Sequence, residues 1–154
     1  MNIQVQICGI VVVSLLIIMS LNRKTIWLRS KKAFLFALFS TLIALIFDTL
    51  SIVAIVTAAG NYTSFTRAVC KIYLVSLVWM AFAMNYYTSV YVGVKNTFIR
   101  IHRIASQIFL GIMTLMIILL PVNIHHTGRN DLYTYGPAVI ATYLSAAIFT
   151  AINV

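Results

Sequence analysis

Five long apolar runs dominate this chain and limit what it can fold into. Crossing a bilayer core about 30 Å thick takes roughly 20 helical residues, and the runs are of about that length or longer. With 62% hydrophobic and 8% charged residues, the chain has too little polar surface to cover a domain of this length with a water-facing shell. We predict an all-α bundle of five transmembrane helices, at residues 5–21, 32–58, 66–92, 104–122 and 137–154. No Pro-, Gly- or Ser-rich linker separates the runs, so residues 1–154 are expected to form one domain.

The positive charges are concentrated in two of the loops that join these runs. The formal net charge is +9, and eight of the 11 Lys and Arg residues lie within residues 23–32 and 95–103. Arg67, Lys71 and Arg129 belong to the opposite side. Basic loops stay in the cytoplasm and contact anionic headgroups. We therefore expect a multi-pass protein of the inner (cytoplasmic) membrane, with its N-terminus outside, its C-terminal end towards the cytoplasm, the lipid bilayer as partner and no nucleic acid.

The stretch "LIFDTLSIV" places Asp48, one of only two acidic residues, inside an apolar run. An ionised side chain at the bilayer centre costs about 2.5–3.5 kcal/mol on insertion scales, so it normally faces the bundle interior beside a partner. The cation at a similar depth is Lys71, and we predict an intramembrane Asp48–Lys71 pair. Further hydrogen bonds are expected from Thr49, Ser51, Tyr73 and Ser76. The pair has three interpretations: a structural contact between the second and third helices, coupling to an ion or proton, or a part in sensing.

A second polar concentration is the outer segment "VNIHHTGRNDLYTYGPAV". It is interpreted as an exposed polar loop or as a pocket for an extracellular small molecule formed by Arg129, Tyr133 and Tyr135. The adjacent histidines His125 and His126 lack a third ligand at metal spacing, so no metal is expected. Gly-Pro at 136–137 favours a turn followed by the first residue of the fifth helix.

Several chemistries have no motif in the sequence. It contains no phosphate-binding glycine loop, no paired carboxylates and no HExxH motif, so we expect no catalysis within this chain and no cofactor. Cys8 and Cys70 fall near the same side of the membrane, where they could form a disulfide or serve as small apolar packing residues.

The apolar motifs also resemble a known family. "MNIQVQICGIVVVSLLIIM", "FDTLSIVAI" and "VCKIYLVSLVWMAFAMNYY" look like the N-terminal membrane region of bacterial, mainly clostridial, GGDEF diguanylate cyclases. "DLYTYGPAVIATY" is similar to a segment of seven-helix membrane sensors that precede histidine kinases and cyclases. The resemblance covers essentially the whole chain, in matching order.

This resemblance implies about seven helices followed by a cytoplasmic enzyme that makes cyclic di-GMP from two GTP molecules and acts as a homodimer. The chain lacks GGDEF residues, so only an input role carries over, to Asp48, Lys71, Tyr135, Gly136 and Pro137. The last run has no basic flank, which we interpret as a chain that continues in the natural protein. The alternatives are a small transporter or channel that uses Asp48 and Lys71, and a structural membrane anchor.

Overall fold

The computed structural model describes residues 3–22, 29–58, 64–91, 97–127 and 131–151, and within them it contains five helices and one β-hairpin. Each helix coincides with one of the predicted apolar runs within three residues at either end, except that the fourth helix begins seven residues before the predicted residue 104. The elements in chain order are α1 (Gln4–Asn22), α2 (Arg29–Thr57), α3 (Ser64–Tyr91), α4 (Thr97–Leu119), β1 (Asn123–Thr127), β2 (Asp131–Tyr135) and α5 (Pro137–Ala151).

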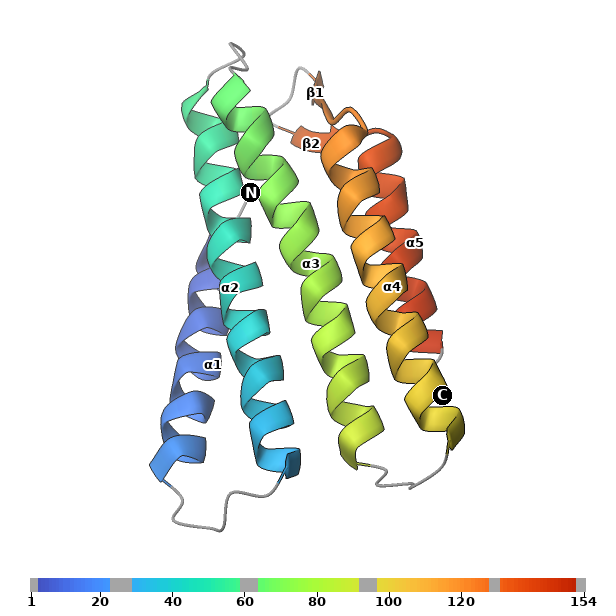
Figure 1. The fold of residues 1–154 in the computed structure, drawn as a ribbon. Coiled ribbons are helices and arrows are strands. Elements are labelled where there is room, and N and C mark those ends of the chain that lie inside the picture. Colours follow the sequence, from blue (N-terminus) through green and yellow to red (C-terminus); the bar gives the residue numbers. More distant parts are fainter. Residues whose placement is uncertain (1–2, 23–28, 59–63, 92–96, 128–130, 152–154) are drawn as a thin grey trace.

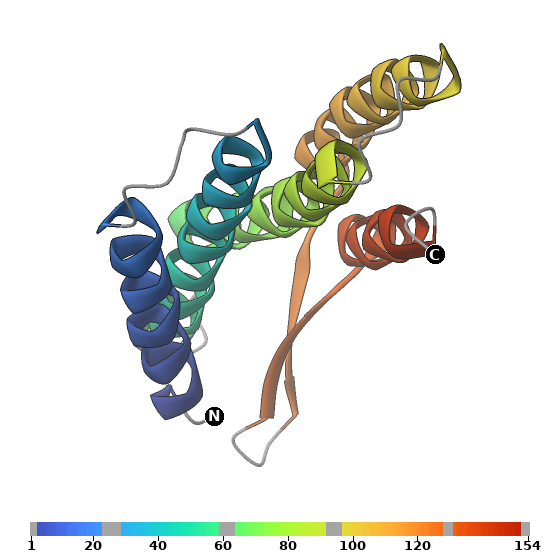
Figure 2. The ribbon, with the colours of Figure 1, turned by 90° about the horizontal axis from the view of Figure 1, so that it is seen from below.

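The five helices run side by side along one axis, with α3 in the middle (Figure 1). α3 packs most extensively on α2, and on its other side it packs on α4 and α5. α1 packs mainly on α2 (Figure 2). Helix α1 is therefore a peripheral element attached along one side of the bundle.

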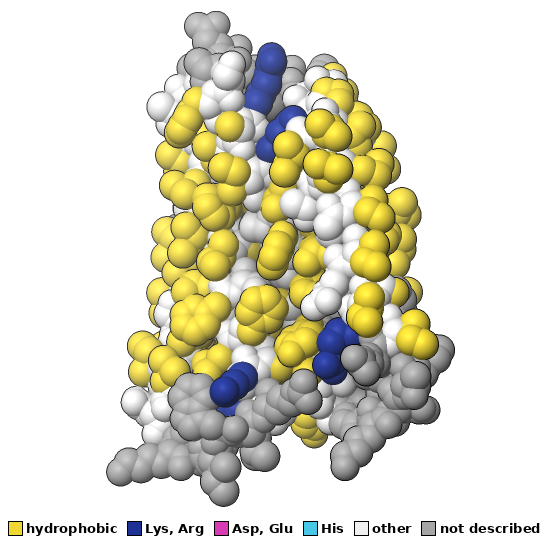
Figure 3. Space-filling model, in the orientation of Figure 1, with side chains coloured by type: hydrophobic (Ala, Val, Ile, Leu, Met, Phe, Trp, Pro, Cys, Tyr) yellow, Lys and Arg dark blue, Asp and Glu magenta, His cyan; other side chains and the backbone are white. Residues whose placement is uncertain are grey.

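Four helices are long and apolar enough to cross a membrane: α1, α2, α3 and α4. Helix α5 is apolar but shorter, with 15 residues. Hydrophobic side chains cover the middle of the face in Figure 3, and the Lys and Arg side chains visible on it lie at its two ends. This distribution is the one expected of a helical bundle whose middle contacts lipid tails. The predicted helical membrane bundle is confirmed to that extent.

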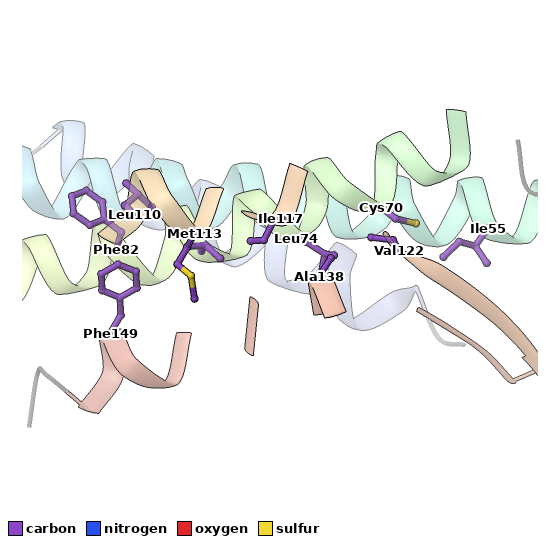
Figure 4. Close-up of a cluster of buried hydrophobic side chains, with 11 residues drawn as sticks. Ile55, Cys70, Leu74, Phe82, Leu110, Met113, Ile117, Val122, Ala138 and Phe149 are labelled. Carbon is purple, nitrogen blue, oxygen red and sulfur yellow. The ribbon is translucent and has the colours of Figure 1, made fainter. Parts of the chain in front are cut away.

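The core lies between α3, α4 and α5 (Figure 4). Near the end opposite the hairpin, Phe82 of α3 and Phe149 of α5 meet edge to face, with ring centroids 6.0 Å apart, and Phe109 of α4 contacts Phe149 in the same way at 5.3 Å. Asn85 is buried here and donates to the Phe149 carbonyl at 3.4 Å. This side-chain to main-chain bond ties the last turn of α5 to α3.

The segment between α4 and α5, expected from the sequence to be an exposed polar loop or a pocket, is a β-hairpin. β1 and β2 are antiparallel, with Asn123 opposite Tyr135 and Thr127 opposite Asp131. A two-stranded hairpin leaves backbone groups unpaired on both outer edges, and such edges do not occur in contact with lipid tails. In a bilayer, the hairpin would therefore lie at one boundary of the hydrocarbon region. We call this end of the bundle the hairpin end, and the opposite end, where α1 and α3 end and α2 and α4 begin, the loop end.

Gly136 joins the hairpin to α5 through a backbone that only glycine adopts readily. Its φ angle is +127°, and its carbonyl accepts the first backbone hydrogen bonds of α5, from Val139 and Ile140. A Cβ added there would lie 3.1 Å from the Pro121 carbonyl oxygen. Pro137 then occupies the first helical position, which needs no N–H donor.

The first prediction concerns this junction. Gly136→Ala should lower the free energy of unfolding by about 1–2 kcal/mol, because alanine is strained at this φ angle and its methyl group meets the Pro121 carbonyl. Gly111→Ala in α4 is the matched control, since a Cβ there meets nothing within 4 Å, and it should be neutral or slightly stabilising. Unfolding in mixed detergent micelles measures both variants. Equal stability of the two would contradict the assigned role of Gly136.

Candidate functional site

Three polar side chains from three helices meet towards the hairpin end of the bundle. Gln6 of α1 donates from Nε2 to Oδ2 of Asp48 on α2, at 3.4 Å. The Tyr73 side chain on α3 lies beside the same Asp48 carboxyl, and Tyr143 of α5 lies near enough to Tyr73 to interact electrostatically. Asp48 itself is half-buried. We call Gln6, Asp48 and Tyr73 the Asp48 cluster.

A close approach of α1 to α2 makes the Gln6–Asp48 contact geometrically accessible. Gly9 lies three residues after Gln6, and Leu45 lies three residues before Asp48, so the two contacts are neighbours on one interface. A Cβ added at Gly9 would lie 3.4 Å from the Leu45 Cδ1 atom. Small residues at such positions let transmembrane helices pack closely. Gly9 and Gln6 therefore lie on the face of α1 that contacts α2, near the N-terminal end of α1.

Lys71 does not join this cluster, and the predicted Asp48–Lys71 ion pair is not formed. Its Nζ atom donates to the Ile118 carbonyl of α4 at 2.6 Å. Positions 71 and 73 are two residues apart and therefore project about 200° apart around α3. The helix face that brings Tyr73 to α2 turns Lys71 towards α4. There Lys71 caps the last turn of α4, where a cation satisfies free carbonyls and complements the helix dipole.

Of the predicted supporting residues, only Tyr73 reaches the Asp48 carboxyl. The hydroxyl of Thr49 donates to the Leu45 carbonyl, that of Ser51 to the Asp48 carbonyl, and that of Ser76 to the Tyr73 carbonyl. In hydrocarbon, a hydroxyl bonded to a carbonyl of its own helix needs no other partner. Their hydrogen-bonding capacity is thus used locally within α2 and α3.

The depth of the cluster follows from Lys71. Its contact with Ile118, in the last turn of α4, places Lys71 level with the end of that helix. Tyr73 lies two residues, or about 3 Å, further into the bundle. The Asp48 carboxyl that it contacts therefore lies near the level at which α4 ends, towards the hairpin end of the bundle. Asp48 thus lies closer to one end of the bundle than its place inside an apolar run suggests.

One buried acceptor in the cluster lacks a hydrogen-bond partner. Gln6 Oε1 is inaccessible to solvent and receives no hydrogen bond, although Gln6 Nε2 is engaged. Gln6 Oε1 is therefore an unused hydrogen-bond acceptor at the α1–α2 interface, and a donor brought to this place would satisfy it.

The residues predicted to form an extracellular pocket are only partly placed. Tyr135 is exposed at the end of β2. The backbone of Tyr133 pairs with that of His125, and Arg129 lies outside the described residues. Cys8 is exposed and Cys70 is buried, and both are free thiols, so no disulfide joins them. Within the described parts of the chain, no group of three His, Cys, Asp or Glu side chains could hold a metal ion.

Comparison with known proteins adds no relative. No family model, no curated protein and no solved structure matches this chain.

The second prediction tests the chemistry of the Asp48 cluster. In Asp48→Asn, the new amide can give one hydrogen bond to Gln6 and take one from it, so stability should stay within about 0.5 kcal/mol of the wild type. Asp48→Leu removes every polar contact and should cost about 1 kcal/mol or more, since interhelical bonds in membranes average about 0.6 kcal/mol each. Thr49→Val, which loses only a bond within its own helix, is the control. Equal losses in the Asn and Leu variants would show that the cluster requires the ionised carboxylate.

Proposed function

We propose that this chain is the membrane-embedded sensory input module of a signalling protein. The observation that carries the proposal is the incompletely satisfied contact of Gln6 with Asp48, which attaches the peripheral helix α1 to the central helices near one membrane boundary. A cue shifts a protein between two arrangements only if it interacts unequally with them. A contact with an unused buried acceptor offers such a difference, because a donor that reaches Gln6 Oε1 in one arrangement would stabilise that arrangement.

The position of the hairpin supports the same proposal. β1 and β2 extend from α4 and α5 towards the side of the bundle on which the N-terminus lies (Figure 2). Residues on the hairpin, such as the exposed Tyr135, are accessible to a solute at this boundary. An extracellular or intramembrane small molecule bound there could alter the attachment of α1.

The proposed topology has the hairpin end outside the cell and the loop end in the cytoplasm of a multi-pass inner-membrane protein. It is supported by the eight basic residues at the loop end. In this topology α5 is the fifth span, the N-terminus is outside, and two further helices complete a seven-helix bundle. α3 and α5 then end on the cytoplasmic side, where an output domain receives the signal.

The proposed output is a cytoplasmic diguanylate cyclase in the full-length protein, which forms a homodimer because two GTP-loaded domains must meet. The support for this choice is the resemblance of "FDTLSIVAI" and "VCKIYLVSLVWMAFAMNYY" to sensor regions of GGDEF proteins. The alternative is a transporter or channel that uses Asp48 and Lys71. It depends on an ion pair between these residues, but each of them has a different partner.

The third prediction tests the sensor function. The gene is read beyond codon 154, where two further apolar spans and a GGDEF stretch are expected, and cyclic di-GMP synthesis is then measured in membranes containing the full-length protein. Asp48→Leu should change the rate several-fold at equal protein amount, because α1 loses its polar attachment. Thr49→Val should leave it unchanged. A reading frame without a cyclase, or an Asp48→Leu rate equal to that of the wild type, would contradict the proposal.

A further inference from the structure

The loop end of the bundle has a large excess of positive charge. Among the basic side chains that the structure describes, Lys31, Lys32 and Arg103 lie at this end. Asp48 lies in the cluster near the hairpin end, and Asp131 begins β2. Neither of the two acidic residues of the sequence is therefore at the same end of the bundle as Arg103.

Arg103 differs from a cation on a freely solvated loop because helix packing fixes its position. It lies on α4, one turn before Ser106 and two turns before Leu110, which are both buried, so it continues the inward-facing stripe of that helix. Its guanidinium carbon lies 5.4 Å from the centroid of the Tyr86 ring on α3. Figure 3 shows that the Lys and Arg side chains on that face are confined to the two ends.

The Tyr86 ring is itself held by other aromatic side chains. It stacks on Phe82 at 6.4 Å between centroids and meets Phe36 of α2 edge to face at 6.2 Å. Because side chains of α2 and α3 hold the Tyr86 ring in place, it offers a fixed aromatic face to the guanidinium group of Arg103. Arginine stacks on such faces and still presents its planar donors to an anion.

Two nitrogen atoms at this place are buried without a partner. Arg103 Nε and the neighbouring His102 Nε2 have almost no solvent-accessible surface and make no hydrogen bond. Each unpaired buried polar group of this kind calls for a water, an ion or another ligand. Both residues are half-buried.

The depth of Arg103 indicates where its anion comes from. It lies 16 residues, or about 24 Å, from the α4 end that marks the hydrocarbon boundary at the hairpin end. In a core about 30 Å thick, it is therefore a few ångströms inside the opposite boundary. An arginine at this depth extends its head to the interface. Phospholipid phosphates are concentrated at that level, whereas anions dissolved in water are not.

We propose that Arg103, His102 and Tyr86 form a binding site for the phosphate of an anionic phospholipid between α3 and α4 at the loop end. The guanidinium group binds the phosphate as a planar fork, Tyr86 orients the guanidinium group, and His102 adds a second nitrogen. The site is independent of the proposed sensor function. It would anchor the α3–α4 pair to one leaflet.

The fourth prediction concerns lipid retention. The chain is purified in nanodiscs of phosphatidylcholine with a minor fraction of phosphatidylglycerol, and bound lipids are counted by native mass spectrometry after release. The wild type should retain phosphatidylglycerol in preference to phosphatidylcholine, and Arg103→Gln should lose most of that preference. Lys32→Gln is the matched control, because it removes an equal charge from an exposed position at the same end, and it should keep the preference.

Two further measurements separate the sources of the phosphate and guard against misfolding. Phosphatidylglycerol should raise the thermal unfolding midpoint of the wild type, whereas inorganic phosphate in phosphatidylcholine nanodiscs should not. If Arg103→Gln does not fold, Arg103→Lys replaces it; this variant keeps the charge but loses the planar fork, and should retain less phosphatidylglycerol than the wild type. Unchanged lipid preference in the Arg103 variant that folds, or an equal midpoint rise with inorganic phosphate, would overturn the proposal.

Discussion

The hydrogen bond between Gln6 and Asp48 is the interaction on which the attachment of α1 depends. Lipid tails are as apolar as leucine side chains, so burial of apolar surface gives transmembrane helices little reason to associate. Close packing and polar contacts must supply the attraction instead. Along α1, Ile17 is buried by α2, Gly9 allows a close approach to Leu45, and Gln6 provides the polar contact. Each of the other helices packs on at least two neighbours, whereas α1 packs mainly on α2, so α1 is the element that a small change at Asp48 would affect first.

The two ends of the bundle use their few polar groups differently. At the hairpin end, Asp48 contacts Gln6 and Tyr73, and Lys71 donates to the Ile118 carbonyl, whereas Arg67 is exposed. At the loop end, Arg103 has an aromatic face but no acid. At the hairpin end, Asp48 and Lys71 are thus held within the chain, whereas the lipid site proposed at the loop end would supply an anion to Arg103. This division is consistent with the proposed signal path from the hairpin end to the loop end.

The sequence predicted the helices well and the contacts between them poorly, for identifiable physical reasons. Long apolar runs locate helices because hydropathy depends on composition alone. Lys71 was predicted to pair with Asp48 because the two residues lie at a similar depth. The partner of a side chain also depends on the direction in which it projects around its helix, and on α3 it is Tyr73, not Lys71, that faces α2. The hairpin was missed because its strands, "NIHHT" and "DLYTY", are short and lack a clear apolar alternation. The contact of Gln6 could have been predicted from the sequence. A glutamine three residues before Gly9 indicates a polar, closely packed face on an otherwise apolar helix.

The most direct test of this account is a double-mutant cycle on Gln6 and Asp48. The free energy of unfolding is measured in mixed micelles for the wild type, Gln6→Met, Asp48→Leu and the double variant. The account predicts that the two losses are non-additive by about 0.5 kcal/mol or more, the order found for interhelical hydrogen bonds in membranes. The parallel cycle of Gln6→Met with Thr49→Val should be additive, because Thr49 bonds within its own helix. Additive losses in the Gln6–Asp48 cycle would contradict the claim that this contact holds α1 to the bundle.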